Sequence, residues 1–296
     1  MSPGSPAGGP LVGVVVLTQG RRPQSLAAAL DSVLAQEGVR TDVLVVGNGW
    51  APTGLPAGVR ALALSENLGI PAGRNAGVPH VAGDLLLFLD DDAALTGTGW
   101  LADVAGRFAA DPGLGLVQPR VDADDGGPAP RRWTPRLRVG DPRRPSAAFS
   151  VWEGAVVVRR GTFEAAGGWP APFFYAHEGI ELAWRVWDAG CTVRYAGDVA
   201  VSHPRTSPAR HADHLRLNAR NRVWLARRNL PWVLGVPYVA SWTALQVVRS
   251  VRAPASLLPW SAGWWEGWRS PAAGQRRPLR WGTVARMARH GRPPVI

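Results

Sequence analysis

Short apolar runs alternate with segments of helical spacing along the first 120 residues. The apolar runs predict strands at 12–18, 42–46, 59–64 and 84–89. Between them, apolar residues recur every three or four positions and predict helices at 24–36, 69–81 and 100–110. Strands and helices that alternate with short loops build a parallel sheet with right-handed crossovers. The pattern therefore predicts an α/β fold with a mostly parallel sheet flanked by helices.

The pattern changes near residue 120. A strand is expected at 115–119, and residues 122–146 then bring Pro, Gly, Asp and Arg together without periodicity, which predicts a loop. Its arginines are Arg131, Arg132, Arg136, Arg138, Arg143 and Arg144. Long loops in compact domains often serve as lids, so this one either closes over phosphate groups or is a solvated surface loop. A strand at 150–159 and a helix at 161–169 are expected to follow.

The most informative junction lies where the apolar run 85–89 meets Asp90, Asp91 and Asp92. A continuous run of this length is typical of a strand buried on both faces. Open α/β sheets bind ligands beyond the carboxyl ends of their strands, and clustered carboxylates there repel one another unless a hard cation such as Mg²⁺ or Mn²⁺ holds them. The junction therefore predicts a site for a metal and a diphosphate. The alternative is a solvated turn in which the acids cap the next helix.

A second acidic group consists of Glu178 and Glu181, which are three residues apart on an expected helix and so share a face. Two carboxylates near one cleft can have different roles: one acts as a general base with a raised pKa, and the other forms an ion pair with Arg185. Glu178 also suits compensation of the helix dipole, because it stands at the helix start. The residues alone leave these alternatives open.

Composition narrows the chemistry. The chain has 296 residues, a formal net charge of +11 and no lysine, so mechanisms that need a lysine amine are excluded. The positive charge suits an anionic partner. The single cysteine, Cys191, excludes an intramolecular disulfide and a Cys-rich zinc site, and it favours the cytoplasm. Residues 1–10 lack the pattern of a signal peptide and are expected to be a disordered lead-in.

Six segments, in this order, carry a resemblance to a known family. They are VVVLT, VVGNG, NLGIPAGRNAG, LLLFLDDDA, GAVVVRRGTFEAAGGW and FFYAHEGIELAWR. Over residues 11–225 the chain resembles the family 2 glycosyltransferases, which are inverting enzymes of GT-A fold, and in particular the bacterial branch with rhamnosyltransferase-like and galactofuranosyltransferase-like members. The resemblance implies transfer of a sugar from a UDP- or dTDP-sugar to a hydroxyl of a glycan or lipid-linked acceptor.

The resemblance also implies a set of contacts to the nucleotide sugar. These fall on Thr18, Arg22, Asn48, Asn67, Gly69, Arg74, Asp90 and Asp91. Arg74 would meet the base or the diphosphate, since arginines and helix N-termini favour anions, and its alternative is a charge on a helix surface. The chain departs from the family at Gly47, where an Asp is usual, and at Gln19-Gly20, which replace an Asn that often precedes the first-loop arginine.

Asp90 and Asp92 match the Asp-x-Asp motif of the family. The resemblance makes Asp92 the direct ligand of Mg²⁺ or Mn²⁺ and places Asp90 near the ribose or a metal-bound water. His203 matches a histidine that completes the metal shell in some members, and its alternative is a structural histidine. The implied cation would neutralise the charge of the leaving diphosphate.

The stretch 178–181 matches the acidic Glu-Asp-x-Asp-Leu motif that supplies the family's general base. The second acid of the motif is Gly179 here, so Glu178 is the first candidate for the base and Glu181 the second. The base would take the proton of the acceptor hydroxyl as its oxygen attacks the anomeric carbon opposite the diphosphate. Positions expected on the acceptor side are Trp152, Glu153, Gly154 and Trp169, of which Trp169 also suits a core position.

The C-terminal part, residues 226–296, is expected to be a helical region rich in Trp and Arg. Residues 230–248 carry no charge and approach the length of a membrane span, but Gly235 and Pro237 interrupt them and their hydropathy is marginal. Peripheral attachment to an anionic membrane is favoured over a soluble helical appendage and a true span. The expected location is therefore the cytoplasm, at the inner face of the plasma membrane.

Other classes of protein fit less well. A nucleic-acid-binding protein would explain the basic composition, but no recognisable module with interleaved basic and aromatic residues is present, and no nucleic acid is expected as a partner. A Rossmann dehydrogenase needs G-x-G-x-x-G after its first strand, and a sugar-nucleotidyltransferase needs a Gly-rich loop and a lysine there. A catalytically inactive relative that only binds nucleotide sugar stays open because of Gly47 and Gly179.

Overall fold

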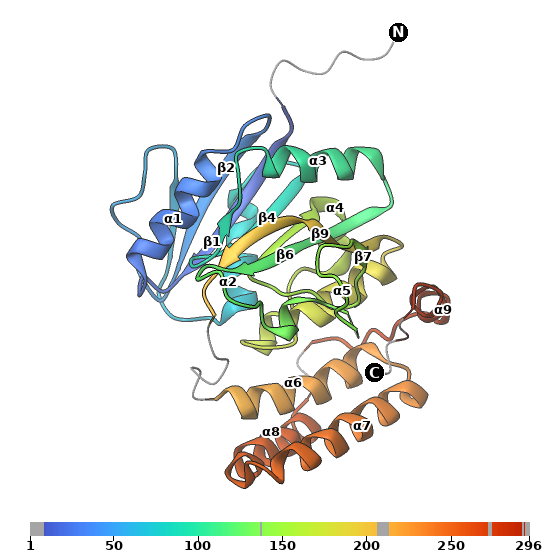
Figure 1. The fold of residues 1–296 in the computed structure, drawn as a ribbon. Coiled ribbons are helices and arrows are strands. Elements are labelled where there is room, and N and C mark those ends of the chain that lie inside the picture. The colour runs from blue at the N-terminus through green and yellow to red at the C-terminus, as the bar shows by residue number, and fades with distance from the viewer. Residues whose placement is uncertain (1–8, 137, 206–212, 272–273, 292, 294–296) are drawn as a thin grey trace.

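The computed structural model describes residues 9–136, 138–205, 213–271, 274–291 and 293. A central sheet carries helices on both faces, and a further layer of helices lies beneath it (Figure 1). The expected α/β class with a mostly parallel sheet is confirmed. Most of the lead-in expected at 1–10 falls on residues 1–8, which lie outside the described residues.

The elements follow the predicted order closely over the first half of the chain. The strands are β1 Leu11–Thr18, β2 Arg40–Asn48, β3 Arg60–Leu64, β4 Leu85–Asp90, β5 Ala94–Leu95, β6 Leu114–Ala123, β7 Ser146–Ala147, β8 Ala155–Arg159 and β9 Thr192–His203. The helices are α1 Pro23–Leu34, α2 Ile70–Gly77, α3 Trp100–Ala110, α4 Arg160–Ala166, α5 Glu178–Asp188, α6 His214–Asn229, α7 Trp232–Ser250, α8 Leu257–Arg269 and α9 Trp281–Arg289.

The sheet has the order β3-β2-β1-β4-β8-β6-β9-β5, and β7 pairs with β9. Strands β3, β2, β1 and β4 run parallel, whereas β8 runs antiparallel between β4 and β6. The carboxyl ends of β1, β2 and β4 therefore meet at one edge of the sheet. Thr18, Asn48 and Asp90, the last residues of these three strands, lie at that edge.

The helices expected at 69–81 and 161–169 are shorter in the structure, which ends them at Gly77 and Ala166, and two predicted strands also differ. The strand expected at 150–159 begins only at Ala155, because the preceding residues form a loop in which the Trp152 amide donates to Gln118 Oε1 at 2.8 Å. The strand expected at 115–119 continues to Ala123, since it pairs in parallel with β9 as far as His203. The loop expected from 122 thus begins later, and the long pairing with β9 brings His203 to the site.

The sheet separates two hydrophobic cores. One core lies under α1 and α3, and the other lies under α2, α4 and α5. Buried residues of α6, α7 and α9, among them Trp224, Tyr238 and Met287, belong to the second core. The Trp184 ring of α5 meets the Tyr238 ring edge-on, with centroids 5.9 Å apart. The C-terminal helices are therefore packed onto the α/β part.

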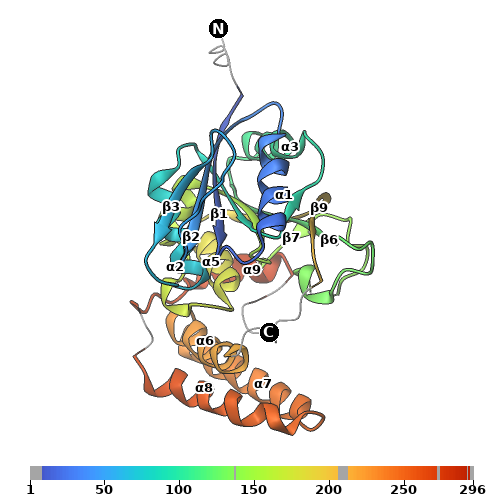
Figure 2. The same ribbon diagram turned by 90° about the vertical axis from the view of Figure 1, so that its left-hand side faces the viewer.

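Helices α6, α7 and α8 form the layer beneath the sheet, whereas α9 lies apart from them beside α5 (Figures 1 and 2). Residue 225, at which the sequence divides the chain, falls inside α6. Within the described residues, no helix combines the length and the apolar character that crossing a membrane requires. The α7 helix, which takes in residues 232–248 of the uncharged stretch, is included in that finding.

Candidate active site

The three acids predicted after β4 lie at the carboxyl edge of the sheet. Asp91 and Asp92 are buried, with 4% and 7% of their surface exposed. Thr18 Oγ1 donates to Asp91 Oδ2 at 2.5 Å, and Arg22 Nη2 lies 2.6 Å from Asp91 Oδ1. Arg22 also forms an ion pair with Asp92. The acids are thus held inside a network of polar contacts, which contradicts the alternative of a solvated turn.

Asp90, Asp92 and His203 form a group that can hold a metal ion. One ligand atom from each residue lies within 4.8 Å of the other two, and His203 Nε2 is 3.1 Å from Asp92 Oδ1. The His203 ring makes T-shaped contacts with the Trp133 and Trp152 rings, at centroid distances of 5.3 and 4.9 Å. Two carboxylates and an imidazole suit Mn²⁺ or Mg²⁺, so the donor set fits a divalent cation.

Arg74 supports this group from α2. Its guanidinium is buried, donates to Asp90 Oδ1 at 2.7 Å and lies 5.0 Å over the Trp169 ring. Burial acts to raise the pKa of Asp90, but the charges of Arg74, His203 and Arg22 outweigh it and lower that pKa below its usual value. Asp90 is therefore ionised at neutral pH. Because Arg74 is only 1% exposed, the alternative of a surface helix charge is wrong.

A cavity of about 350 Å³ opens on one side of the acids. It is lined by Thr18, Arg22, Asn48, Asp90 and Asp91, among others, and is called the Asn48 cavity below. The Asn48 side chain donates to Asn67 Oδ1 at 2.8 Å and accepts from the Leu68 amide at 2.8 Å. Asn67 Oδ1 in turn accepts from the Gly69 amide at 2.9 Å. Asn67 and Gly69 therefore fix the wall of the cavity rather than line it.

The structure explains why glycine stands at position 47. A Cβ on Gly47 would lie 2.0 Å from the Trp50 carbonyl oxygen and within 3 Å of the Pro52 ring. No side chain fits there without a shift of the backbone. In this chain, the loop after β2 therefore leaves room only for glycine at position 47.

A second cavity, of about 360 Å³, lies on the other side of Asp90 and is called the Glu178 cavity below. It shares Ile70 and Asp90 with the Asn48 cavity. Among the residues that line it are Trp152, Glu153, Gly154, Glu178 and His203. Asp90, a member of the metal group, therefore lines both cavities, one of which contains Asn48 and the other a buried glutamate.

Two acids, Glu178 and Glu153, line the Glu178 cavity. Burial and then the charge of Glu153 raise the pKa of Glu178 to about 8. Burial also raises the pKa of Glu153. A carboxyl with a pKa near 8 gives up its proton close to neutral pH, which is the property of a general base.

Glu153 occupies the space beside Gly179. The Gly179 amide donates to Glu153 Oε1 at 2.9 Å, and a Cβ on Gly179 would lie 2.6 Å from that oxygen and 2.3 Å from the Val151 carbonyl oxygen. The second acid of the site thus comes from the loop before β8, whereas α5 has a glycine. The loss of an acid at position 179 and the presence of Glu153 are two parts of one arrangement.

Two of the predicted site residues lie elsewhere. Glu181 does not line the Glu178 cavity; its carboxylate accepts from Arg228 at 2.8 Å and from Asn229 at 2.9 Å. Its ion pair is thus with Arg228 of α6 instead of the expected Arg185. Trp169 is 1% exposed and packs against Phe88, at a centroid distance of 5.3 Å, and under Arg74. The structure places it in the core, where its ring offers no face to an acceptor.

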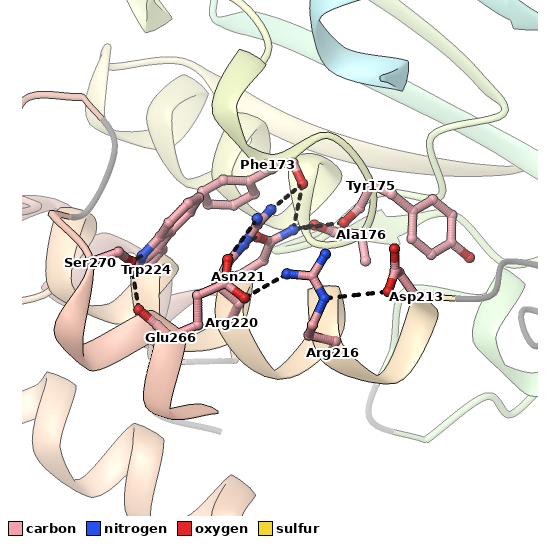
Figure 3. Close-up of polar contacts among 10 residues, drawn as sticks. All are labelled: Phe173, Tyr175, Ala176, Asp213, Arg216, Arg220, Asn221, Trp224, Glu266 and Ser270. Carbon is pink, nitrogen blue, oxygen red and sulfur yellow. Dashed lines mark hydrogen bonds and ion pairs between the residues drawn. The ribbon is translucent and has the colours of Figure 1, made fainter. Parts of the chain in front are cut away.

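The loop before Glu178 has an uncommon backbone and is held by α6. Phe174, Ala176 and His177 have φ values of 64°, 72° and 70°, in the left-handed region. Figure 3 shows the Asn221 amide directed at this loop. It donates to the carbonyl oxygens of Phe173, Tyr175 and Ala176 at 2.8, 2.6 and 3.0 Å. One buried side chain of α6 therefore fixes the segment that leads into Glu178.

Further contacts in Figure 3 brace α6 itself. Arg220 Nη2 donates to the Phe173 carbonyl at 3.0 Å, and its Nη1 lies 3.2 Å from Glu266 of α8. Glu266 also accepts from Arg216 at 2.6 Å. The C-terminal helices are thus connected to the site through α6.

Several residues of the Glu178 cavity were not predicted as site residues. They are Ile70, Arg132, Trp133, Ser150, Val151, Tyr175, Ala176, His177, Ile180 and Asn218. Trp133 belongs to the Arg131–Trp133 turn inside the arginine-rich loop. The sequence signal that could have marked it as a site residue is an aromatic residue among arginines. Asn218 carries no such indication, because it comes from a helix at the edge of the expected catalytic region.

Comparisons with known proteins agree with this geometry. A family model described as "Glycosyl transferase family 2" matches residues 13–165. The pre-mycofactocin glycosyltransferase of Mycobacterium tuberculosis is 29% identical over 168 residues, which cover 54% of this chain and 33% of that protein. The match thus spans about a third of the length of that relative.

Three solved structures show the same fold. GalNAc-T7, solved with UDP, GalNAc and Mn²⁺, has a TM-score of 0.58 at 15% identity over 78% of this chain and 50% of its own. The mannosyltransferase PcManGT of Pyrobaculum calidifontis, in complex with GDP-Man and Mn²⁺, has a TM-score of 0.56 at 20% identity, and the match covers 98% of this chain and 78% of that one. S. aureus TarS, residues 1–349, has a TM-score of 0.52 at 14% identity, and the match covers 72% of this chain and 65% of that one. The fold of this chain is GT-A. Because the family model covers more than half of the 296 residues, the chain belongs to glycosyl transferase family 2.

Proposed function

We propose that this glycosyltransferase is an inverting enzyme that moves a sugar from a nucleotide-diphosphate sugar to an acceptor hydroxyl. The observation that carries the proposal is that Asp90, a member of the metal group, lines two cavities, one containing Asn48 and the other the buried Glu178. A nucleotide in the first cavity and an acceptor in the second would meet at Asp90.

The donor would lie along the Asn48 cavity. Thr18, Arg22 and Asn48 line it with polar groups, and Asn67 and Gly69 hold Asn48 in place. Arg74 and Arg22 bring positive charge to the edge that faces a diphosphate. A divalent cation on Asp90, Asp92 and His203 would neutralise the charge of the leaving diphosphate.

Glu178 would act as the general base. Its carboxylate takes the proton of the acceptor hydroxyl, and the acceptor oxygen forms a bond to the anomeric carbon while the bond from that carbon to the diphosphate oxygen breaks. Attack opposite the leaving group inverts the configuration. Glu181 is tied to Arg228 and Asn229, so the geometry favours Glu178 for this role.

On the acceptor side, Trp152, Glu153 and Gly154 line the cavity beside Glu178. We propose a glycan or lipid-linked acceptor, a UDP- or dTDP-sugar of the rhamnosyl or galactofuranosyl type as donor, and a cytoplasmic location with peripheral contact to an anionic membrane. GDP-sugars belong in the same screen, because one structural neighbour was solved with GDP-Man.

The proposal is tested by incubating the protein with UDP-, dTDP- and GDP-sugars and Mn²⁺ and measuring release of the nucleoside diphosphate. We expect one nucleotide to be released, with loss of release in Glu178→Gln and retention in Glu181→Gln. Nucleotide binding without release of any diphosphate, with or without candidate acceptors, would instead support an inactive nucleotide-sugar-binding relative.

A further inference from the structure

A basic groove lies between the arginine-rich loop and α7. It has a volume of about 730 Å³, and its lining includes Arg131, Arg132 and Arg136 from the loop and Trp242 and Arg249 from α7. No carboxylate is among the described residues that line it. Four guanidinium groups around one hollow create a positive potential that attracts phosphate and diphosphate groups. This basic groove is separate from the carboxylates of the metal group.

The basic groove adjoins the Glu178 cavity, because Arg132 and Ser150 line both. A phosphorylated molecule held in the basic groove can therefore extend toward Glu178. The groove thus lies on the acceptor side, whereas the Asn48 cavity lies across Asp90.

A fifth arginine, Arg222, does not line the basic groove but contacts Trp242, which does. Arg222 of α6 stacks on the Trp242 ring at 3.9 Å and donates to the Tyr238 hydroxyl at 3.0 Å. Among the described residues, none forms an ion pair with Arg222. Burial lowers the pKa of Arg222, and the charge of Arg249 lowers it further. The charges of Arg222 and Arg249 both add to the positive potential of this region.

The outer face of α7 is apolar and exposed. Val233, Val236, Val247 and Val251 recur at helical spacing and are 67%, 56%, 51% and 79% exposed. Leu258, at the start of α8, is 79% exposed. A solvated helix normally presents polar residues on such a face, whereas an interfacial helix lays an apolar face into the lipid.

The charge of the C-terminal region suits an anionic lipid surface. Residues 214–296 contain fourteen arginines and a single acid, Glu266, which is already paired with Arg216 and Arg220. Arg249 lies in the last turn of α7 and Arg252 follows the helix by two residues, and both are exposed. Arginines next to an apolar helix face are typical of attachment to anionic membranes.

We infer that the basic groove binds the phosphate or diphosphate headgroup of a lipid-linked acceptor while the apolar face of α7 lies in the membrane interface. The inference rests on the proposed function, since it names the acceptor class of that reaction. The lipid tail lies along α7, the anionic headgroup lies among Arg132, Arg136 and Arg249, and the hydroxyl to be glycosylated reaches Glu178.

The test is co-sedimentation of the full chain with three kinds of vesicle. They contain phosphatidylcholine alone, phosphatidylcholine with phosphatidylglycerol, and phosphatidylcholine with a polyprenyl phosphate at the same surface charge. The variant Arg249→Gln removes a groove cation, and Arg252→Gln removes an exposed cation three residues away that does not line the groove. Both positions are exposed, so both variants are expected to fold, and their melting temperatures are checked against the wild type.

The wild type is expected to bind polyprenyl phosphate vesicles more tightly than phosphatidylglycerol vesicles. Arg249→Gln should weaken binding to the polyprenyl phosphate vesicles about fivefold more than Arg252→Gln does, as one arginine near a headgroup contributes about 1 kcal/mol. An equal loss of vesicle binding in both variants would show that only the overall positive charge matters, and it would overturn the headgroup site. Competition by inorganic diphosphate in solution, with no preference among vesicles, would also overturn it, since the groove would then bind a free anion.

Nucleotide binding is measured on the same samples. If vesicle selectivity holds but no nucleoside diphosphate binds, the proposed function fails and the lipid site stands. If nucleotide binds and vesicle selectivity is missing, the groove inference fails alone.

Discussion

Asn221→Ala should disable catalysis while leaving the donor site intact. Asn221 is fully buried and donates to three carbonyl oxygens of the loop that leads into Glu178. In the variant, Phe173 keeps the bond from Arg220, whereas Tyr175 and Ala176 lose this donor. The carbonyl groups of Tyr175 and Ala176 are partly buried, and the loss of a donor costs about 0.5 to 1.5 kcal/mol for each, so the free energy of unfolding should fall by roughly 1 to 3 kcal/mol.

The backbone conformation of the loop before Glu178 explains why the Asn221→Ala variant should lose activity. Phe174, Ala176 and His177 are in the left-handed region, which costs a residue with a Cβ about 1 to 2 kcal/mol. Once the amide of Asn221 is removed, the loop lowers its free energy by relaxing toward ordinary φ values, and this relaxation displaces Glu178. A displacement of about 1 Å at a catalytic group lowers the rate on the order of a hundredfold. We therefore expect kcat to fall about a hundredfold and nucleotide affinity to stay the same.

The matched control is Asn229→Ala. Asn229 is also fully buried on α6 and also donates through its amide, at 2.9 Å to Glu181 and at 2.9 Å to the Leu225 carbonyl. It does not line the Glu178 cavity. Melting temperature, nucleotide Kd and kcat are measured for both variants. The reasoning is refuted if Asn221→Ala keeps the wild-type kcat, or if Asn229→Ala loses kcat to the same extent.

Three further predictions concern the acidic pair and its neighbours. The folded-state pKa of Glu178, about 8, lies above the ordinary value of 4.5, so the stability that its carboxyl contributes is present below pH 4.5 and is lost as the pH rises through 8. The difference in melting temperature between Glu178→Gln and the wild type, measured without metal, should therefore increase in favour of the variant as the pH rises from 4.5 to 8. A difference that does not change with pH would contradict a buried acid with a raised pKa. In the active protein, kcat/KM should increase with pH up to about 8, and a flat profile would exclude Glu178 as the base. Gly179→Ala should lower both stability and kcat, because its Cβ would meet the Val151 carbonyl oxygen and displace the Glu153 carboxylate; a wild-type melting temperature would show that the loop yields easily.

The first half of the fold was predictable because its information is local. Strands such as β1 and β4 are unbroken apolar runs, and helix α3 has the predicted bounds 100–110. Buried parallel strands need only apolar side chains on both faces, and a sequence shows this directly. The acids after β4 were found for the same reason, since the carboxyl end of a strand is also its end in the sequence.

The Glu178 cavity was harder to predict because distant segments build it. Asn218 and Asn221 come from a helix that the sequence divides at residue 225, and nothing in their neighbourhood indicates that they face a loop more than 40 residues earlier. The hydrogen bond from the Gly179 amide to Glu153 could likewise not be predicted from the sequence, although the sequence does mark both residues as site positions. Trp169 shows the opposite case, in which a plausible surface residue is buried under Arg74.

The central claim is that the acids after β4 form a metal-dependent site for a nucleoside diphosphate. It is tested most directly by titration calorimetry with UDP, dTDP and GDP, with and without Mn²⁺, on the wild type, Asp92→Asn and Glu178→Gln. The account predicts that one nucleotide binds in the presence of Mn²⁺, that Asp92→Asn abolishes this binding, and that Glu178→Gln retains it. Binding that is indifferent to Mn²⁺ and to Asp92, or no binding of any of the three nucleotides, would contradict the account.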